Sequence, residues 1–275
     1  MPARIKLEMH HCVAQVTLSY PKRFNAMSRV MWRELKQIFE SIQGDPTVRC
    51  VLVQGQGPNF CAGGDISEYT SFRFEESSLR EFHETDVWGG LGAMLACDVP
   101  VVAQIAGNCM GAGVEIASCC DIRIAGTSAR FGAPIARLGF PMAPREAQLL
   151  TRELGLLTVR QMLLEAAVLD ASDMAQRGFL TRVVPDDVLG AQAQATVQRI
   201  ASLAPTAARL NKKTIRALNS TPVLVEHAHG TSKNVADIDP LSDLLAQAYA
   251  YADSAEQREG IAAFLEKRPP VYAAH

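Results

Sequence analysis

The sequence lacks an excess of either charge. Its 27 lysines and arginines are balanced by 29 aspartates and glutamates, which gives a formal net charge of −2. Proteins that bind nucleic acids or anionic membranes generally carry a basic excess, so we expect neither kind of partner. The sequence has seven cysteines, an odd number without C-x-x-C spacing. They predict reduced core residues of a cytoplasmic protein, and we expect neither disulfides nor a bound metal.

A long uninterrupted hydrophobic run is also absent. The longest uncharged stretch, residues 99–114, is too short and too broken by proline and glycine to span a bilayer. Residues 1–20 lack the continuous apolar centre and the cleavage site of a secretory signal, which again favours the cytoplasm. The sequence has no G-x-S-x-G, no Walker loop and no metal-binding histidine spacing, so the corresponding chemistries are not indicated.

Strand-like and helix-like stretches alternate through the first half of the chain. Residues 5–9 and 12–18 alternate apolar and polar side chains, which predicts an opening hairpin. Ser28 precedes apolar positions at helical spacing, which predicts a helix with a side-chain cap. Further strands are expected at 50–53, 101–105 and 122–125, and helices at 79–96 and 111–119. These repeated units indicate an α/β core with largely parallel strands.

After Pro144 the pattern becomes mainly helical. We expect helices at 144–154, 158–166, 172–177, 187–203 and 206–219, a strand at 180–184 and a loop at 221–240. Ser254 and Gln257 form a capping-box pattern ahead of a last helix. A chain of 275 residues can bury one large core with a small appended region. The prediction is a core over residues 1–200 and a helical region over 201–275.

Two glycine-rich turns carry the groups suited to chemistry. Residues 104–125 read Q-I-A-G-N-C-M-G-A-G-V-E-I-A-S-C-C-D-I-R-I-A, a strand, a glycine turn and an apolar helix with one carboxylate, Glu115. The first turn of a helix has unpaired N–H donors and a positive dipole end, so it can hold a developing negative oxygen. A second turn, N-F-C-A-G-G-D-I at residues 59–66, can direct another N–H to the same oxygen.

Glu115 has two interpretations. A carboxylate in an apolar glycine-rich turn is desolvated, which favours a raised pKa and proton transfer. The alternative is a structural role, as a negative charge favourably placed in the first turn of a helix. The glycines likewise could serve only as tight turns of an α/β fold.

Together these motifs resemble the crotonase (enoyl-CoA hydratase/isomerase) superfamily. The resemblance covers almost the whole chain and includes L-S-Y-P-K-R-F-N-A-M-S (18–28), R-F-G-A-P (130–134) and E-G-I-A-A-F-L-E-K-R (259–268). It implies an α/β fold, a crotonase-like spiral of ββα units with a C-terminal helical region that builds trimers or dimers of trimers. It also implies a coenzyme A thioester as substrate and no permanently bound cofactor.

The same resemblance assigns roles to individual residues. The backbone N–H groups of Gly64 and Ala112 match the donors that hold the thioester oxygen and stabilise an enolate, and Glu115 matches the first catalytic glutamate. The positions that match the family's coenzyme A contacts are Lys22, Arg23, Ala26, Ala62, Asp65 and Ile66. Lys267 and Arg268 lie in the C-terminal motif, where they could reach a phosphate from a neighbouring subunit or be solvated surface residues.

The sequence departs from the hydratase pattern at Ile135, the position that matches the second catalytic glutamate. Two carboxylates normally hold and split the water, so this change leaves isomerisation, decarboxylation, thioester hydrolysis or non-catalytic acyl-CoA binding as alternatives. Glu146, at the start of the helix after Pro144, is the best substitute carboxylate, and His83 is a further candidate because histidine titrates near neutrality. Both could also be ordinary helix residues.

Overall fold

The computed structural model describes residues 2–219 and 248–273. The chain divides into two compact units, Met1–Ala201 and Ser202–His275. The loop predicted at 221–240 lies outside the described residues. Among those that are described, no helix is both long and apolar enough to cross a membrane.

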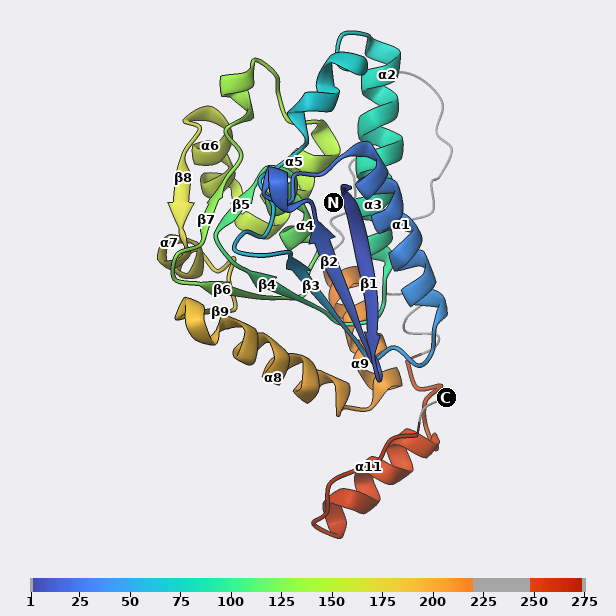
Figure 1. Ribbon diagram of the computed structural model, residues 1–275. Helices are drawn as coiled ribbons and strands as arrows, with labels where there is room; N and C mark the ends of the chain where they lie inside the picture. The colour runs from blue at the N-terminus through green and yellow to red at the C-terminus, as the bar shows by residue number, and fades with distance from the viewer. Residues whose placement is uncertain (1, 220–247, 274–275) are drawn as a thin grey trace, which may run out of the picture. The chain divides into compact units, whose positions relative to one another are not determined.

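The first unit is built around a six-stranded sheet in the order β1-β2-β3-β4-β6-β9 (Figure 1). Its strands are β1 (Arg4–His10), β2 (Val13–Ser19), β3 (Cys50–Gly55), β4 (Val101–Ile105), β6 (Ile122–Gly126) and β9 (Arg182–Val184). β1 and β2 form the predicted hairpin, in which Ile5 is opposite Leu18. All other neighbours in this sheet are parallel, which confirms the predicted α/β core.

A second, three-stranded sheet joins the two glycine-rich turns. It contains β5 (Asn108–Met110), β7 (Arg130–Gly132) and β8 (Val168–Asp170), with β5 parallel to β7 and β7 antiparallel to β8. An isolated parallel bridge pairs Cys61 with Cys109 of β5. This pairing places the turn at 59–66 beside the turn that opens the next helix.

Helices surround the sheets and fall close to the predicted ranges. In the first unit they are α1 (Arg29–Gly44), α2 (Glu76–Glu81), α3 (Trp88–Ala96), α4 (Ala112–Ser118), α5 (Pro144–Leu154), α6 (Leu156–Leu164), α7 (Ala171–Gln176) and α8 (Leu189–Ala201). The short 3-10 helices are η1 (Pro21–Arg23), η2 (Ile66–Ser71), η4 (Ile135–Leu138) and η5 (Asp186–Val188). The second unit contains α9 (Pro205–Leu218) and α11 (Ala255–Leu265).

Both predicted helix caps form. The hydroxyl of Ser28 accepts a hydrogen bond from the N–H of Met31 at the start of α1. In α11 the hydroxyl of Ser254 accepts from the N–H of Gln257, whose side chain accepts in return from the N–H of Asp253. These contacts satisfy N–H groups that the first turn of a helix leaves unpaired.

The helix predicted over 79–96 is not an α-helix throughout. Between α2 and α3 the chain forms a π-helix, η3 (Phe82–Val87), so the three segments follow one another as a helix of changing width. Hydrophobic periodicity cannot reveal this change, because one extra residue in a turn alters the direction of only a few side chains. Single π turns within helices are frequent at functional sites.

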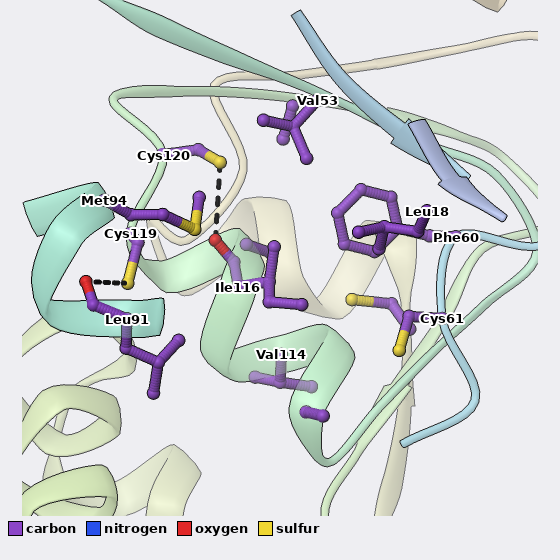
Figure 2. Packing of buried hydrophobic residues seen from close by; sticks show 14 of the residues in the cluster. Leu18, Val53, Phe60, Cys61, Leu91, Met94, Val114, Ile116, Cys119 and Cys120 are labelled. Carbon is purple, nitrogen blue, oxygen red and sulfur yellow. Dashed lines mark hydrogen bonds between the residues drawn. The ribbon is translucent and has the colours of Figure 1, made fainter. Parts of the chain in front are cut away.

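The two faces of the large sheet pack against different helices. Alternate residues of the strands, including Val13, Leu52 and Val102, form one cluster with apolar residues of α8. The opposite side faces the main core, which contains residues of α1, α3 and α4. All described side chains of α4 are buried, and Figure 2 shows Val114 and Ile116 of this helix among side chains of neighbouring elements. The sheet and this core therefore hold α4, and with it Glu115, in a fixed position.

The cysteines behave as core residues. All seven are free thiols, and six of them are buried. Figure 2 shows Cys119 Sγ directed at the carbonyl of Leu91, at 3.8 Å, and Cys120 Sγ directed at that of Ile116, at 3.3 Å. Burial raises the pKa of the Cys61 thiol to about 12, which makes its reactive thiolate rare at neutral pH.

Candidate active site

A cavity of about 330 Å³ lies in the first unit, where the two glycine-rich turns meet. Its wall also includes residues of η3, η4 and the first turn of α5. Most of the lining is aromatic or aliphatic, and a few polar groups point into it. A concave apolar site with few polar groups is typical of small-molecule binding.

The first turn leaves the N–H of Gly64 available to this cavity. Met27 donates its N–H to the carbonyl of Gly63 at 2.8 Å and accepts from the N–H of Asp65 at 2.8 Å. Because these bonds engage the residues on either side of it, the N–H of Gly64 is directed away from Met27. Gly64 itself lines the cavity.

The second turn likewise leaves an N–H available to the cavity, that of Ala112, the first residue of α4. The N–H of Gly111 donates to the carbonyl of Gly132 at 2.8 Å, and the carbonyl of Gly111 accepts from Glu115 at 3.0 Å. The N–H of Ala112 belongs to the first turn, where a helix offers no backbone acceptor. Within the described residues, neither Gly64 nor Ala112 donates its N–H to another backbone group.

Two glycines make this arrangement possible. Gly111 has a φ of 46°, in the left-handed region that side chains with a Cβ rarely adopt. At Gly113 a Cβ would lie 2.6 Å from the carbonyl oxygen of Cys61, so only glycine lets the two turns approach. Gly111 and Gly113 are therefore required for the close approach of the two glycine-rich turns.

Glu115 lies in the first turn of α4, is buried and lines the cavity. Its pKa is raised well above 4.5, first by burial and second by the nearby charge of Glu146, while Arg73 opposes the shift. Burial of this kind favours the protonated form of a carboxylate and suits it to proton transfer.

Glu146 and His83, the two substitutes considered for the missing carboxylate, are in contact. Nδ1 of His83 lies 2.7 Å from Oε1 of Glu146, and both side chains line the cavity. Glu146 is buried in the first turn of α5, and His83 belongs to η3. Ile135, which replaces the second glutamate of the hydratase pattern, lies on the same wall. The cavity thus contains two carboxylates that interact electrostatically, Glu115 and Glu146.

The positions matched to coenzyme A contacts are more dispersed. Ala62 and Ile66 line the cavity, and Ala26 is buried. Asp65 is buried as the cap of η2, with its carboxylate accepting from the N–H and hydroxyl of Ser67. Lys22 and Arg23 are exposed on η1 in the first unit, and Lys267 is exposed in the second.

The sequence analysis missed several side chains of the cavity wall, among them Tyr69, Arg73 and Phe140. The guanidinium carbon of Arg73 lies 4.1 Å from the ring centroid of Tyr69 and 3.8 Å from that of Phe140. The only signal available was an arginine in an aromatic-rich stretch, Y-T-S-F-R-F at residues 69–74, which does not reveal contact with Phe140.

Comparison with known proteins agrees with this geometry. The family model described as Enoyl-CoA hydratase/isomerase matches residues 8–275. A probable enoyl-CoA hydratase from Mycobacterium tuberculosis is 31% identical over 272 residues, covering 98% of this chain and 97% of the relative. A crotonyl-CoA hydratase from Syntrophomonas wolfei is 31% identical over 271 residues, covering 96% of this chain and 95% of the relative.

Solved structures lead to the same family. The crystal structure of an enoyl-CoA hydratase/carnithine racemase from Magnetospirillum magneticum matches with a TM-score of 0.89 at 34% identity, covering 100% of this chain and 97% of that one. An enoyl-CoA hydratase from Bacillus anthracis matches with a TM-score of 0.84 at 25% identity, covering 98% and 99%. The chain has the mixed α/β crotonase fold and belongs to the enoyl-CoA hydratase/isomerase family.

Proposed function

We propose that this protein catalyses the hydration of 2-enoyl-CoA thioesters. The observation that carries the proposal is that Glu115 and Glu146 line one cavity with the available N–H groups of Gly64 and Ala112. Glu146 then supplies the carboxylate that Ile135 does not. The names of the relatives, which include a crotonyl-CoA hydratase, support the same reaction.

In this proposal the thioester oxygen accepts hydrogen bonds from Gly64 and Ala112. Negative charge develops on this oxygen only as the enolate forms, so the two donors stabilise the transition state more than the substrate. Removal of one such donor typically costs about 3–4 kcal/mol of barrier lowering. The donors are backbone groups, which is compatible with alanine in place of glycine at position 112.

In the proposed reaction Glu146 and Glu115 each carry out one proton transfer. Glu146, held by His83, accepts a proton from water while the water oxygen bonds to the β carbon. Glu115, whose raised pKa favours its protonated form, gives its proton to the α carbon. Transfer of the water proton from Glu146 to Glu115 restores the starting state.

A second candidate reaction, isomerisation of 3-enoyl-CoA, is favoured by Ile135. An apolar side chain where hydratases carry a glutamate removes one ligand of the water. A single base then takes a proton from the α carbon and returns it to the γ carbon, with the enolate held by the same two donors. Decarboxylation, thioester hydrolysis and non-catalytic binding remain the other outcomes to be tested.

The test is turnover of crotonyl-CoA and of a 3-enoyl-CoA by the wild type, Glu115→Gln and Glu146→Gln. Hydration requires loss of the crotonyl double bond, and isomerisation requires conversion of the 3-enoyl substrate to the conjugated product. Glu40→Gln is the matched control, since Glu40 is exposed on α1 and pairs only loosely with Lys36 at 3.8 Å. If neither thioester reacts and an acyl-CoA panel releases CO2 or free CoA, the proposal is wrong.

We also propose that the nucleotide end of coenzyme A lies along η1, with Lys22 and Arg23 near its phosphates and Ala62 and Ile66 near the pantetheine arm. The exposed side chains on η1 are the support for this placement. Charge reversal at Lys22 and Arg23 would then raise the KM for acyl-CoA with little change in kcat.

Residues 201–275 are proposed to form the contacts of a trimer or a dimer of trimers, which would bring Lys267 of one subunit to the coenzyme of another. The support is that α11 exposes large apolar side chains at Ile261, Phe264 and Leu265. Sedimentation analysis of the wild type and of Phe264→Glu tests the assembly, with a trimer or larger expected only for the wild type.

A further inference from the structure

Arg73 is a charged side chain in a wall that is otherwise mainly apolar. It follows η2, and its backbone N–H donates to the carbonyl of Tyr69 at 2.9 Å. Its guanidinium contacts the rings of both Tyr69 and Phe140, with centroid distances of 4.1 Å and 3.8 Å. All three residues line the cavity that contains Glu115. The ring contacts hold the cation in a defined orientation.

The planes of the two rings are inclined by 72° to each other, so Tyr69 and Phe140 contact the guanidinium from two different directions. All N–H groups of arginine lie in the guanidinium plane, in a fork that matches the two oxygens of a carboxylate. Nε of Arg73 is buried and has no hydrogen-bond partner among the residues that the structure describes. Arg73 as a whole is only partly buried, and it lines the cavity.

The carboxylates of the cavity do not form an ion pair with Arg73. Over residues 2–219 and 248–273, no aspartate or glutamate lies within ion-pair distance of Arg73. Glu146 is engaged with His83 at 2.7 Å. Glu84, exposed near the cavity wall, pairs with Arg145 at 2.9 Å. In the described part of the protein Arg73 therefore has no ion-pair partner, although its charge acts on Glu115 at longer range.

Tyr69 contacts both Arg73 and Gly64, one of the two proposed oxyanion donors. A Cβ built on Gly64 would overlap the hydroxyl of Tyr69, so this hydroxyl lies against Gly64. The face of the same ring contacts the guanidinium. Gly64 and Arg73 thus both contact Tyr69 and lie on neighbouring parts of the cavity wall, which favours a short acyl chain over a long one.

We infer that Arg73 binds a second carboxylate at the far end of the acyl group, so that the preferred substrates are coenzyme A thioesters of short dicarboxylic acids. This inference rests on the proposed function for the placement of the thioester at Gly64 and Ala112. Arg73 is then a specificity-determining residue: it holds the distal carboxylate through its fork, and the reacting double bond lies between the two anchored ends.

The experiment separates recognition from turnover by using saturated thioesters, which cannot be hydrated. Calorimetry measures the Kd of glutaryl-CoA and of valeryl-CoA, which have acyl chains of equal length and differ in the distal carboxylate. The wild type is expected to bind glutaryl-CoA about tenfold to a hundredfold more tightly, the range expected for charge-assisted hydrogen bonds. Arg73→Leu is expected to abolish this preference, and Arg73→Lys to retain part of it.

Arg80→Leu is the matched control, because Arg80 is an exposed arginine of α2 that pairs with Glu76. It should keep the wild-type preference. Equal binding of the two thioesters by the wild type, or an undiminished preference in a folded Arg73→Leu, would overturn the inference, as would failure of the wild type to bind either.

A parallel turnover assay compares glutaconyl-CoA with 2-pentenoyl-CoA. A binding preference for glutaryl-CoA without hydration or isomerisation of any enoyl-CoA supports carboxylate recognition and contradicts the proposed reaction. Efficient turnover of an enoyl-CoA together with equal binding of glutaryl-CoA and valeryl-CoA supports the proposed reaction and contradicts carboxylate recognition by Arg73.

Discussion

His83 Nδ1 lies 2.7 Å from Glu146 Oε1, and this contact joins two residues 63 positions apart in the chain. The histidine comes from the π-helix η3 and the glutamate from the first turn of α5. Both line the cavity that contains Glu115. A buried carboxylate fixed by a hydrogen bond is preorganised for proton transfer, and this is the basis of the role proposed for Glu146.

His83 acts through Glu146 in the proposed mechanism and is therefore a positioning residue. Glu146→Gln is expected to lower kcat by about 100-fold or more, the usual contribution of a general base. His83→Ala should reduce kcat by a smaller factor with little change in KM, because the carboxylate loses its hydrogen-bonding partner while the proposed acyl-CoA contacts remain. The measurement is kcat and KM for crotonyl-CoA hydration.

His10→Ala is the control for these variants, since His10 is exposed on β1. An unchanged kcat in His83→Ala, with or without a rise in KM, would show that the contact with Glu146 is only structural.

Glu115 should make stability depend on pH. The folded protein raises its pKa well above 4.5, so the folded state retains a proton that the unfolded chain has lost. The free energy of unfolding therefore falls as pH rises from the ordinary carboxyl pKa to the raised one, by up to about 1.4 kcal/mol per pH unit. Glu115→Gln has no charge to bury and should gain stability relative to the wild type over this window.

Urea unfolding at several pH values measures this difference, with Glu40→Gln on the exposed side of α1 as the comparison. A constant difference between Glu115→Gln and the wild type at all pH values would contradict the argued protonation of Glu115.

Gly64 is expected to accept a side chain only if Tyr69 or the loop moves. A Cβ at this position overlaps the Tyr69 hydroxyl, so Gly64→Ala must shift either the Tyr69 side chain or the loop that carries one proposed oxyanion donor. Misplacement by about 1 Å can cost about 100-fold in rate. We expect Gly64→Ala to lower kcat strongly, and the double variant with Tyr69→Phe to recover part of the loss.

The double-mutant cycle is evaluated on kcat, with acyl-CoA affinity measured in parallel. Strict additivity of the two substitutions would refute the steric coupling between Gly64 and Tyr69.

Ile135 provides a test of whether Glu146 replaces the second hydratase carboxylate. In wild type, Ile135→Glu adds a third carboxylate to a cavity that already contains Glu115 and Glu146, and like-charge repulsion should lower activity. In the Glu146→Gln background the same change should restore hydration by about tenfold or more, because a carboxylate again supports the water. The readout is crotonyl-CoA hydration by the two single variants and the double variant.

Gain of activity on Ile135→Glu alone would mean that Glu146 does not serve as the second carboxylate. Ile38→Glu is unsuitable as a control because Ile38 packs against the core, so Val30→Glu, at an exposed position of α1, controls for the added charge.

Local sequence was enough to predict the family, the order of strands and helices, and the two turns with the proposed oxyanion donors. The glycines of 63–64 and 111–113, the carboxylate of Glu115 and the cap at Ser28 were all predicted because each depends on residues close together in the chain. Backbone conformation and capping are local properties, so short motifs report them well. The largely parallel sheet followed from the alternation of strands and helices.

Tertiary structure decided which side chains share the cavity. The sequence offered Glu146 and His83 as separate candidates, and only the packing of η3 and α5 brings them to 2.7 Å. Arg73 was not found at all, because its surroundings are completed by Phe140, which is distant in sequence. Such contacts depend on how separate elements pack, and the π turn that carries His83 leaves no trace in hydrophobic periodicity.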